Sequence, residues 1–461
     1  MTGLKRKPIR WVPEMPDIRR NIDWALSSFE RWEKSMNGDS RTGLHGIRKA
    51  ALRTFAERGF PTTKEEEWRF TSVAPIASMS FTPALESMPT KVTASDITRY
   101  LLGNLESSRL VFLDGHFSAD LSNVSRMPKG VHVGSLAEHL RNDTALVHNY
   151  LTRQARPEEG AFTALNTAFL QDGAFLYVPD GVELGDPIHL LFLASDREGP
   201  FIQTPRNLVV AGEGCRLSIV ETYHSLAGRK YFTNVVSEII AGSRTVIEHD
   251  KLQNESGNTF HVGTTHVSLG GQSNFVSNTI SFGGSLVRNN VTVVLEAEGS
   301  ECTLNGLSVS TGVQLIDNHT TIDHAKPNCT SHELYKAILD GRSRGVFNGK
   351  IFVRKDAQKT DAKQTNKTLL LSDGATVDTK PQLEIFADDV KCTHGATVGQ
   401  LDEEQVFYLR SRGIPLEAAR DILTFAFASD VVNRVHVEPL RGQLDAMLRA
   451  RLRQGRVAEG D

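Results

Sequence analysis

Short runs of β-branched and apolar residues, separated by glycine and polar residues, occupy the middle of the chain from about residue 174 to residue 398. Glycine-marked turns recur at Gly212, Gly242, Gly270 and Gly299, at intervals of roughly 28 to 30 residues. A strand–turn unit that repeats over this length predicts a solenoid, in which each coil buries its apolar face against the next coil. Examples of the runs are residues 207–211, 235–240, 290–295 and 368–371.

A β-sandwich is the competing architecture, because short strands fit both folds. The regular spacing favours the solenoid, and few segments carry the two-residue hairpin turns that antiparallel sheets use. We therefore expect a mainly β protein whose core, residues 166–400, is a right-handed parallel β-helix.

The N-terminal flank shows helical periodicity instead. Residues 45–60 carry apolar side chains four residues apart, and Gly59 stands where such a helix should stop. Aromatic residues between positions 24 and 32 predict an earlier amphipathic helix, and the apolar run 110–113 predicts a strand. We expect residues 1–165 to form an N-terminal helical or mixed domain.

The helical pattern returns at the C-terminal end. Asp402, with Gln405 three residues on, is a capping-box pattern that opens a short helix, and Pro415 suits the first turn of the next helix. The run 422–428 is apolar on nearly every side, which predicts a buried helix. We expect residues 401–461 to form a C-terminal helical domain.

The last helix carries leucines four residues apart, with arginines on its other faces. We interpret the arginines as a solvated helix face, and an acidic partner surface is the alternative. The tail from Gln454 is expected to be frayed. The leucines are Leu440, Leu444, Leu448 and Leu452, and the arginines are Arg441, Arg449, Arg451 and Arg453.

The composition argues against several functional classes. The 461 residues include 52 basic and 55 acidic side chains, a net charge of −3, whereas nucleic-acid binding usually leaves a basic footprint. No run approaches the roughly 18 apolar residues of a membrane span, and the basic N-terminus lacks the apolar stretch of a secretory signal. Four scattered cysteines do not form a disulfide framework. We expect a cytoplasmic protein with reduced thiols.

The common catalytic motifs are missing from the sequence. It contains no GxxxxGK[ST] segment, so we expect no nucleotide to be bound by this chain, and it contains no HExxH zinc motif. One GxSxG match surrounds Ser343, but it lies between β-rich segments and not in the strand–turn–helix setting of a nucleophile elbow. We interpret it as a glycine-bordered turn and expect the protein not to be an enzyme.

Cys392 and His394 are the main candidates for metal chemistry. Residues two apart in a strand face the same side, so the thiol and the imidazole would project together, and such a pair suits iron or zinc. Two ligands leave a metal site incomplete, and the remainder would come from elsewhere in the fold, from sulfide or from a second subunit. Spacing alone leaves open the alternative of a buried thiol beside a hydrogen-bonded histidine.

The other cysteines and histidines are weaker candidates. Three cysteines are interpreted as small buried hydrophobes. Two histidine pairs have a spacing of five, which puts the members of each pair on opposite faces of a strand, and we interpret them as isolated core or surface residues. The residues are Cys215, Cys302 and Cys329, with the pairs His261 and His266, and His319 and His324.

Four segments closely resemble the SufB/SufD family of iron–sulfur cluster assembly proteins, and its SufD branch in particular. The resemblance spans roughly residues 20 to 440, and the long segment around Cys392 is far more specific than a short motif. The SufB branch carries Glu-His-Glu-Ala at that place, without the Lys-Cys-x-His-Gly of this chain. The segments are 65–71 (EEEWRFT), 165–173 (LNTAFLQDG), 380–399 (KPQLEIFADDVKCTHGATVG) and 402–414 (DEEQVFYLRSRGI).

The resemblance implies a scaffold subunit that works with a SufB-type subunit and a SufC-type ATPase. It implies pairing with the SufB-type subunit through the β-helix, docking of the ATPase on the C-terminal helices, and a transient iron–sulfur cluster assembled at the subunit interface. By motif position His394 would be a cluster or iron ligand, with Cys392 ligating or shaping the site. A homodimer in isolation is the alternative assembly.

Two other functions compete with this interpretation. A carbohydrate-active enzyme of the pectin-lyase type would need clustered carboxylates along a groove, and such enzymes are usually secreted. A purely structural β-helix protein would have no metal role. Polysaccharide cleavage tests the first alternative, and iron and sulfide analysis after anaerobic purification tests the second.

Overall fold

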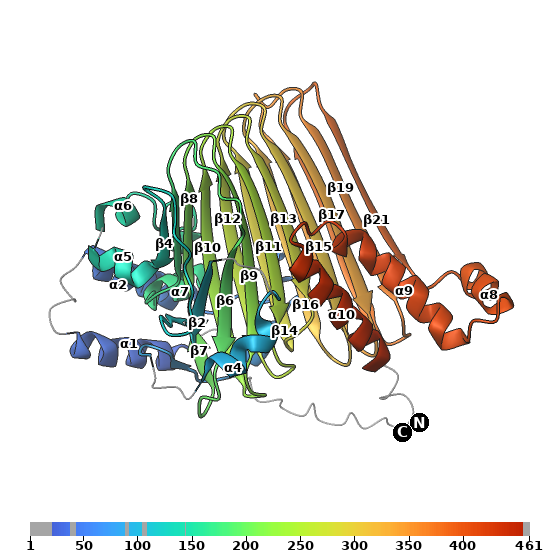
Figure 1. The fold of residues 1–461 in the computed structure, drawn as a ribbon, viewed down its shortest axis with the longest axis horizontal. Coiled ribbons are helices and arrows are strands. Elements are labelled where there is room, and N and C mark those ends of the chain that lie inside the picture. The colour runs from blue at the N-terminus through green and yellow to red at the C-terminus, as the bar shows by residue number, and fades with distance from the viewer. Residues whose placement is uncertain (1–20, 37–42, 88–91, 104–107, 143, 455–461) are drawn as a thin grey trace, which may run out of the picture.

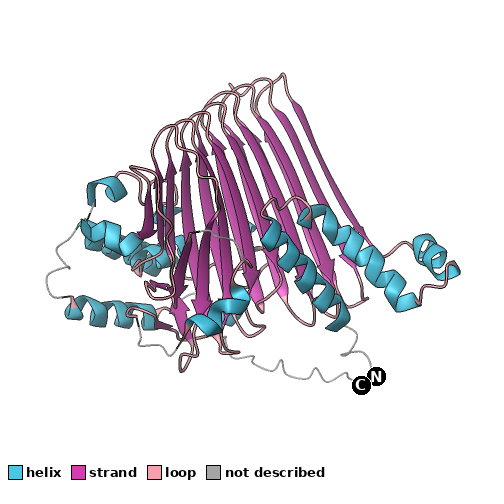
Figure 2. Ribbon diagram, viewed as in Figure 1, coloured by secondary structure: helices cyan, strands magenta, loops and turns pink. Residues whose placement is uncertain are grey.

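A parallel β-solenoid with helices at both ends of the chain forms the structure, a computed structural model that describes residues 21–36, 43–87, 92–103, 108–142 and 144–454 (Figure 1). The mainly β fold predicted from the sequence is confirmed (Figure 2). The basic N-terminal residues and the tail after Gln454 lie outside the described residues. Within those ranges, no helix is both long and apolar enough to cross a membrane.

From β8 onward, successive strands alternate between two sheets that enclose the interior. In the first sheet the described strands are β1 (Thr82–Pro83), β4 (His132–Ser135), β5 (Ala174–Val178), β7 (Phe201–Gln203), β8 (Arg206–Ala211), β10 (Tyr231–Ala241), β12 (Phe260–Leu269), β14 (Leu286–Leu295), β16 (Leu315–His324), β18 (Arg344–Val353) and β20 (Thr376–Ile385). In the second sheet they are β2 (Arg109–Leu113), β3 (His116–Phe117), β6 (Ile188–Ala194), β9 (Arg216–Ser225), β11 (Val246–Asn254), β13 (Asn274–Ser281), β15 (Glu301–Ser310), β17 (Thr330–Leu339), β19 (Asp361–Leu370) and β21 (Lys391–Gly399).

Pairing between coils is parallel, which decides against the β-sandwich. From β8 to β20 each strand of the first sheet pairs with the next even-numbered strand, and the second sheet follows the same rule with odd numbers. The register runs on without interruption, so that Cys302, Ser331, Ala362 and Cys392 form one column across β15, β17, β19 and β21. The predicted domain boundaries at residues 165 and 400 stay predictions.

The repeating glycines mark turns that stack directly on one another. A Cβ atom at Gly242 would lie 2.7 Å from the carbonyl carbon of Gly212, and one at Gly270 would lie 2.7 Å from that of Gly242. Only glycine, which has no Cβ, allows the backbones to approach so closely. The regular spacing seen in the sequence is therefore the length of one coil.

The interior between the sheets is filled by every second residue of each strand. Phe192 stacks between Phe112 and Tyr223, with ring centroids 4.8 and 4.7 Å away. The three cysteines predicted to be small buried hydrophobes are confirmed as buried, in the same apolar cluster. They are Cys215, Cys302 and Cys329.

The N-terminal helices cover part of the outer face of the first sheet. Trp24, Phe29 and Phe55 are buried in one cluster with Phe232 of β10 and Phe260 of β12. The first two helices predicted from the sequence are confirmed. The helices of this region are α1 (Asp23–Ser35), α2 (Gly43–Arg58), α3 (Ala74–Ala77), α4 (Ala94–Ile97), α5 (Leu136–Asn142), α6 (Thr144–His148) and α7 (Ala161–Ala168), with the 3-10 helices η3 (Glu66–Trp68), η4 (Thr98–Tyr100) and η5 (Pro157–Glu159).

A buried carboxylate on β10, Glu238, is paired with Arg206 of β8 and ties this region to the solenoid. Arg206 Nη2 lies 2.6 Å from Glu238 Oε1, and both side chains are fully buried. Glu238 also accepts hydrogen bonds from the backbone N–H groups of Thr152, Gln154 and Ala155. One carboxylate thereby fixes the loop before η5 against the solenoid.

The C-terminal helices are α8 (Glu403–Ser411), α9 (Leu416–Val432) and α10 (Glu438–Gln454). Apolar residues of α9 and α10, such as Val431 and Leu444, pack against Leu252 and Leu307 on the outer face of the second sheet. Helix α8 extends away from the sheets (Figure 1). The side chain of Asp402 caps α8, as the sequence predicts, by accepting the N–H of Glu404 at 2.9 Å.

Three expectations for these helices were wrong. Pro415 is the N-cap of α9 and not part of its first turn. Helix α9 is not buried all round, because only one of its faces meets the sheet, and Ile422 is 47% exposed. Arg451 does not lie on a solvated face: it is largely covered, its guanidinium lies 5.5 Å from the Phe282 ring, and it donates to Asn254 Oδ1.

Candidate functional site

Cys392 and His394 lie on β21, the last strand of the second sheet. Strand β21 pairs with β19, and no described strand pairs with its other edge. Together with β20 it forms the open end of the solenoid (Figure 1). An unpaired strand edge presents free backbone N–H and C=O groups to which another chain can add.

Both side chains stand over interior positions of the preceding coil. Cys392 is in register with Ala362, and His394 is in register with Gln364. Ala362 and Gln364 are buried inside the solenoid. Side chains in register on parallel strands stack, so both predicted ligands belong to the inner face at its open end. Cys392 packs against the apolar interior and is partly covered, whereas His394 is exposed.

The thiol of Cys392 is held in its protonated form. Burial raises its pKa, the nearby carboxylate of Asp361 adds to the effect, and a hydrogen bond with the Ala362 backbone opposes it. A thiol must lose its proton to bind a metal. Coordination itself drives that loss, so metal binding at Cys392 would release a proton.

A buried carboxyl lies beneath His394, two strands further in. Gln364 Nε2 donates a hydrogen bond to Glu333 Oε2 at 2.7 Å. Burial raises the pKa of Glu333 to about 7, although hydrogen bonds from Thr320 and Gln364 work in the other direction. Glu333, Gln364 and His394 therefore form a polar ladder on β17, β19 and β21.

Among the described residues, no three His, Cys, Asp or Glu side chains are grouped so that they could hold a metal ion. Cys392 and His394 contribute two donor atoms of the kind that iron accepts, a thiolate and an imidazole nitrogen. Their assignment as ligands stays a prediction.

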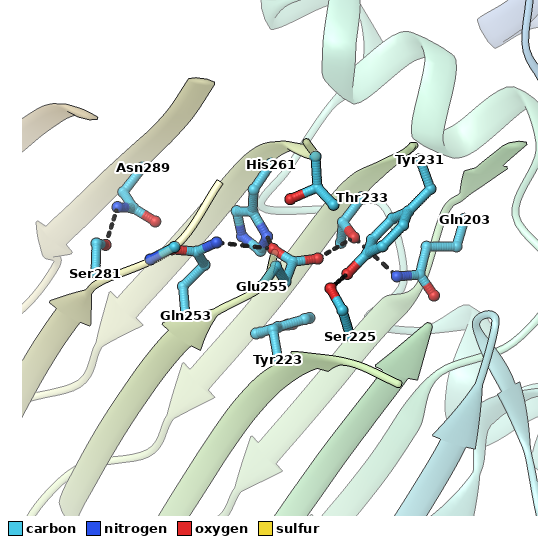
Figure 3. Close-up of polar contacts among 12 residues, drawn as sticks. Gln203, Tyr223, Ser225, Tyr231, Thr233, Gln253, Glu255, His261, Ser281 and Asn289 are labelled. Carbon is cyan, nitrogen blue, oxygen red and sulfur yellow. Dashed lines mark hydrogen bonds and ion pairs between the residues drawn. The ribbon is translucent and has the colours of Figure 1, made fainter. Parts of the chain in front are cut away.

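A polar cluster inside the first half of the solenoid was not expected from the sequence. Glu255 accepts hydrogen bonds from Thr233 at 2.6 Å and Gln253 at 3.0 Å, and it lies 2.7 Å from His261 Nδ1 (Figure 3). Burial lowers the pKa of His261. The interpretation of His261 as an isolated residue was therefore wrong.

The same interior holds a second set of charged residues. Glu221 lies 3.0 Å from His249 Nε2 and also accepts the Tyr223 hydroxyl, while Lys251 Nζ donates to Asn289 Oδ1 at 3.3 Å. Burial lowers the pKa of Lys251. Strand parity is the signal that could have placed these residues inside, since each falls on the same alternation as its apolar neighbours. Their mutual contacts give them a structural role in fixing the register of the coils.

The remaining motifs have local explanations. Ser343 lies in the turn between β17 and β18, where its hydroxyl donates to Ser310 O, so the turn interpretation of the GxSxG match is confirmed. His319 and His324 face opposite sides of β16, as predicted. His319 lies on the outer face between Glu67 and Asp317, and His324 is buried. His319 is therefore not isolated.

A cavity of about 530 Å³ lies between part of the C-terminal helices and the second sheet. Ile338 and Leu371 line it from the solenoid, and Phe407 and Leu416 line it from the helices. Phe407 is 73% exposed, and Tyr408 beside it is 57% exposed. Two large aromatic side chains on a protruding helix are a common feature of protein-binding surfaces.

The fold and the site together define a β-solenoid protein with a thiol–imidazole pair at its open end. Residues 192–427 match the family described as SUF system FeS cluster assembly, SufBD core domain, and residues 24–190 match the SufBD protein N-terminal region. The chain belongs to the SufBD family, and the resemblance seen in the sequence is confirmed.

Individual relatives support the same assignment. An iron–sulfur cluster assembly SufBD family protein of Synechocystis sp. is 35% identical over 434 residues, which cover 92% of this chain and 94% of the relative. The iron–sulfur cluster assembly protein SufD of Escherichia coli is 33% identical over 410 residues, with 88% and 92% covered. The SufD protein of Bacillus subtilis is 28% identical over 332 residues, with 70% and 75% covered.

Proposed function

We propose that this chain is a SufD-type scaffold subunit that holds a nascent iron–sulfur cluster together with a SufB-type subunit and a SufC-type ATPase in the cytoplasm. The cluster is cargo and not a resident cofactor. The neutral imidazole of His394 donates a ring nitrogen to iron, and Cys392 ligates or shapes the site. The chain itself binds no nucleotide and catalyses no covalent step.

The observation that carries the proposal is the position of His394. It is exposed, it stands on the inner face of the last coil, and its strand has an edge that no described strand occupies. A ligand in that position can be completed by donors from a second subunit. We infer that the cargo is an iron–sulfur cluster because relatives that align over most of the chain are named for iron–sulfur cluster assembly.

The SufB-type subunit adds to the open end through β20 and β21. The exposed apolar residues there are Ile385, Phe386 and Val398, and Phe386 is 59% exposed. Strand addition at an unpaired edge satisfies the backbone, while apolar side chains beside it supply buried area. In the absence of this partner, a second copy of the chain could occupy the same edge.

The ATPase docks on the C-terminal helices. Phe407 and Tyr408 of α8, with Ile422 of α9, present exposed apolar surface beside the cavity. Because α9 and α10 are packed on the second sheet, a force applied to α8 is transmitted to the solenoid.

The test of the ligand role is His394→Ala in the complex co-expressed with its two partner proteins. The complex is purified without oxygen, and bound iron and acid-labile sulfide are measured. We expect the complex to assemble but to lose most of its iron and sulfide. His332→Ala is the matched control, because His332 is also an exposed histidine on the second sheet, on β17. Iron and sulfide content equal to that of the control would refute the ligand role.

The docking surface is tested separately by Phe407→Glu, with ATPase retention on the purified complex as the readout. Val124→Glu is the control, because Val124 is 41% exposed and follows Asn123, which bridges to Arg109 at the N-terminal end of the solenoid. We expect only Phe407→Glu to release the ATPase. Equal retention by both variants would exclude α8 as the docking surface.

A further inference from the structure

Gln364 occupies an unusual position directly beneath His394. The two residues are in register on β19 and β21, and Gln364 is 2% exposed. Its Nε2 donates a hydrogen bond to Glu333 Oε2 at 2.7 Å. Its Oε1 is buried and accepts no hydrogen bond from any described residue. A buried amide oxygen without a donor costs free energy, and a donor group that reaches it would remove that cost.

The surroundings hold the amide of Gln364 in place. Gly349 lies across the interior on β18, and a Cβ atom at that position would come within 2.3 Å of Gln364 Nε2. The ring of Phe347 closes the same space, 2.7 Å from that Cβ position. The glycine therefore makes room for the amide. Above about pH 7, where Glu333 is ionised, its carboxylate can only accept, which sets the end of the amide that faces it as the nitrogen.

The structure assigns Gln364 as a positioning residue for His394. Its Oε1 accepts one ring N–H of His394, and the other ring nitrogen is then directed to the open end of the solenoid. Neighbouring parallel strands lie about 4.8 Å apart, a spacing that lets stacked side chains of this length meet. The structure shows no hydrogen bond between the two side chains, so the contact that we propose would form by rotation of the exposed imidazole about its side-chain torsions.

The proposed hydrogen bond matters because it selects one tautomer of His394. A histidine that binds a metal through one nitrogen usually donates its other N–H to an oxygen acceptor, which fixes both the tautomer and the ring plane. Gln364 supplies such an acceptor, and Glu333 behind it keeps the amide from turning. The metal-binding part of this inference rests on the proposed function, whereas the hydrogen bond itself does not.

The neighbouring position on the same strand provides an internal comparison. Asn366 is also buried, its Nδ2 donates to Tyr335 O at 3.2 Å, and its Oδ1 has no donor among the described residues. It lies in register with Ala396, whose side chain has no N–H to offer. Asn366 therefore resembles Gln364 in burial and bonding but faces no histidine.

The test is ¹⁵N NMR of the ring nitrogens of His394 in the full chain, above the pH at which the ring is charged and without metal. The resonance is assigned by its loss in His394→Ala. We expect one tautomer to dominate in the parent protein. Gln364→Met keeps the size but removes the acceptor, and should raise the minor tautomer about fivefold, the ratio for one net hydrogen bond. Asn366→Leu should leave the tautomer ratio unchanged.

A double variant, in which the residues at positions 333 and 364 are exchanged, gives a second test in case Gln364→Met does not fold. Glu333→Gln combined with Gln364→Glu keeps a donor and an acceptor between the two positions and places a carboxylate oxygen beneath His394. This double variant should restore the dominant tautomer. An unchanged ratio in Gln364→Met, or no restoration by the double variant, overturns the assignment.

These outcomes are separate from those of the proposed function. The NMR measurement needs neither iron nor partner proteins, so it can succeed while His394→Ala retains its iron and sulfide. In that case the positioning role stands and the ligand role fails. The reverse result, with loss of iron in His394→Ala but no effect of Gln364→Met on the tautomer, overturns the positioning role alone.

Discussion

The guanidinium carbon of Arg288 lies 3.7 Å from the centroid of the Trp68 ring. Arg288, on β14, also donates to Asp317 Oδ2 at 2.9 Å and to the backbone oxygen of Glu67 at 2.7 Å. Trp68 belongs to the segment 65–71 that carries part of the family resemblance. That segment is therefore a clasp that attaches the N-terminal region to the outer face of the solenoid.

Trp68→Leu should weaken this clasp. It removes a cation–π contact made by a largely desolvated guanidinium, together with part of the apolar packing, and we expect a loss of about 2 to 3 kcal/mol in the free energy of unfolding. Urea denaturation measures the loss. Phe70→Leu is the control, because its cationic neighbour Arg69 is exposed and lies 5.7 Å from the ring. Equal losses in both variants would contradict the clasp.

Glu238→Gln should destabilise the protein more than most single substitutions. It leaves the guanidinium of Arg206 buried without its carboxylate, and such losses are about 3 to 5 kcal/mol. Limited proteolysis should also cut the loop 152–155 faster, because its N–H groups lose a charged acceptor. Arg206→Met combined with Glu238→Gln should recover part of the stability, since the unpaired charge is gone. A double variant no more stable than Glu238→Gln would disprove this account.

Three buried histidines make the fold sensitive to acid. Burial lowers the pKa of His189 to about 3 and that of His224 and His324 to about 4. The unfolded chain, with ordinary histidine pKa values near 6.5, binds more protons than the folded chain below that pH. Stability that is complete above about pH 6.5 should therefore fall as the pH drops towards 4.

The measurement is the urea midpoint between pH 7.5 and pH 4.5. His189→Gln keeps a polar partner for the Thr222 hydroxyl and should make the decline shallower. His332→Gln, on the exposed side of β17, should not change its slope. The same slope in the His189 and His332 variants would show that burial of His189 is not a source of the acid sensitivity.

Glu333 should have the opposite effect on the pH dependence of stability from that of the three histidines. Its pKa is raised to about 7 by burial, so the folded chain binds more protons than the unfolded chain between about pH 4.5 and pH 7. The contribution of Glu333 to stability therefore decreases as the pH rises through this range. Glu333→Gln removes the effect and keeps an acceptor for Gln364.

We expect Glu333→Gln to match the parent near pH 4.5 and to exceed it by about 3 kcal/mol above pH 7, the value of a shift of this size. Urea denaturation at the two pH values measures the difference. A stability difference that does not change between them would rule out Glu333 as a titrating group.

Elements stabilised by near neighbours could be predicted from the sequence. The glycines of successive turns, such as Gly212 and Gly242, repeat because each coil repeats the same backbone contact with the next. The first two helices and the strand 109–113 follow local periodicity in the same way. Helix α9 was misjudged because its apolar run does not tell how many of its faces pack against a neighbour, and the side of the helix that carries Ile422 is half exposed.

The same difference between local pattern and tertiary packing applies to the candidate site. The amino-acid sequence by itself determined that Cys392 and His394 share a strand and that a long segment around them matches one family. Only the tertiary structure decided that this strand is the last of the solenoid and that Gln364 and Glu333 lie beneath His394. The three ladder residues are about thirty positions apart, and what brings them together is the register between coils, which depends on the length of every turn and on side chains that meet across the interior.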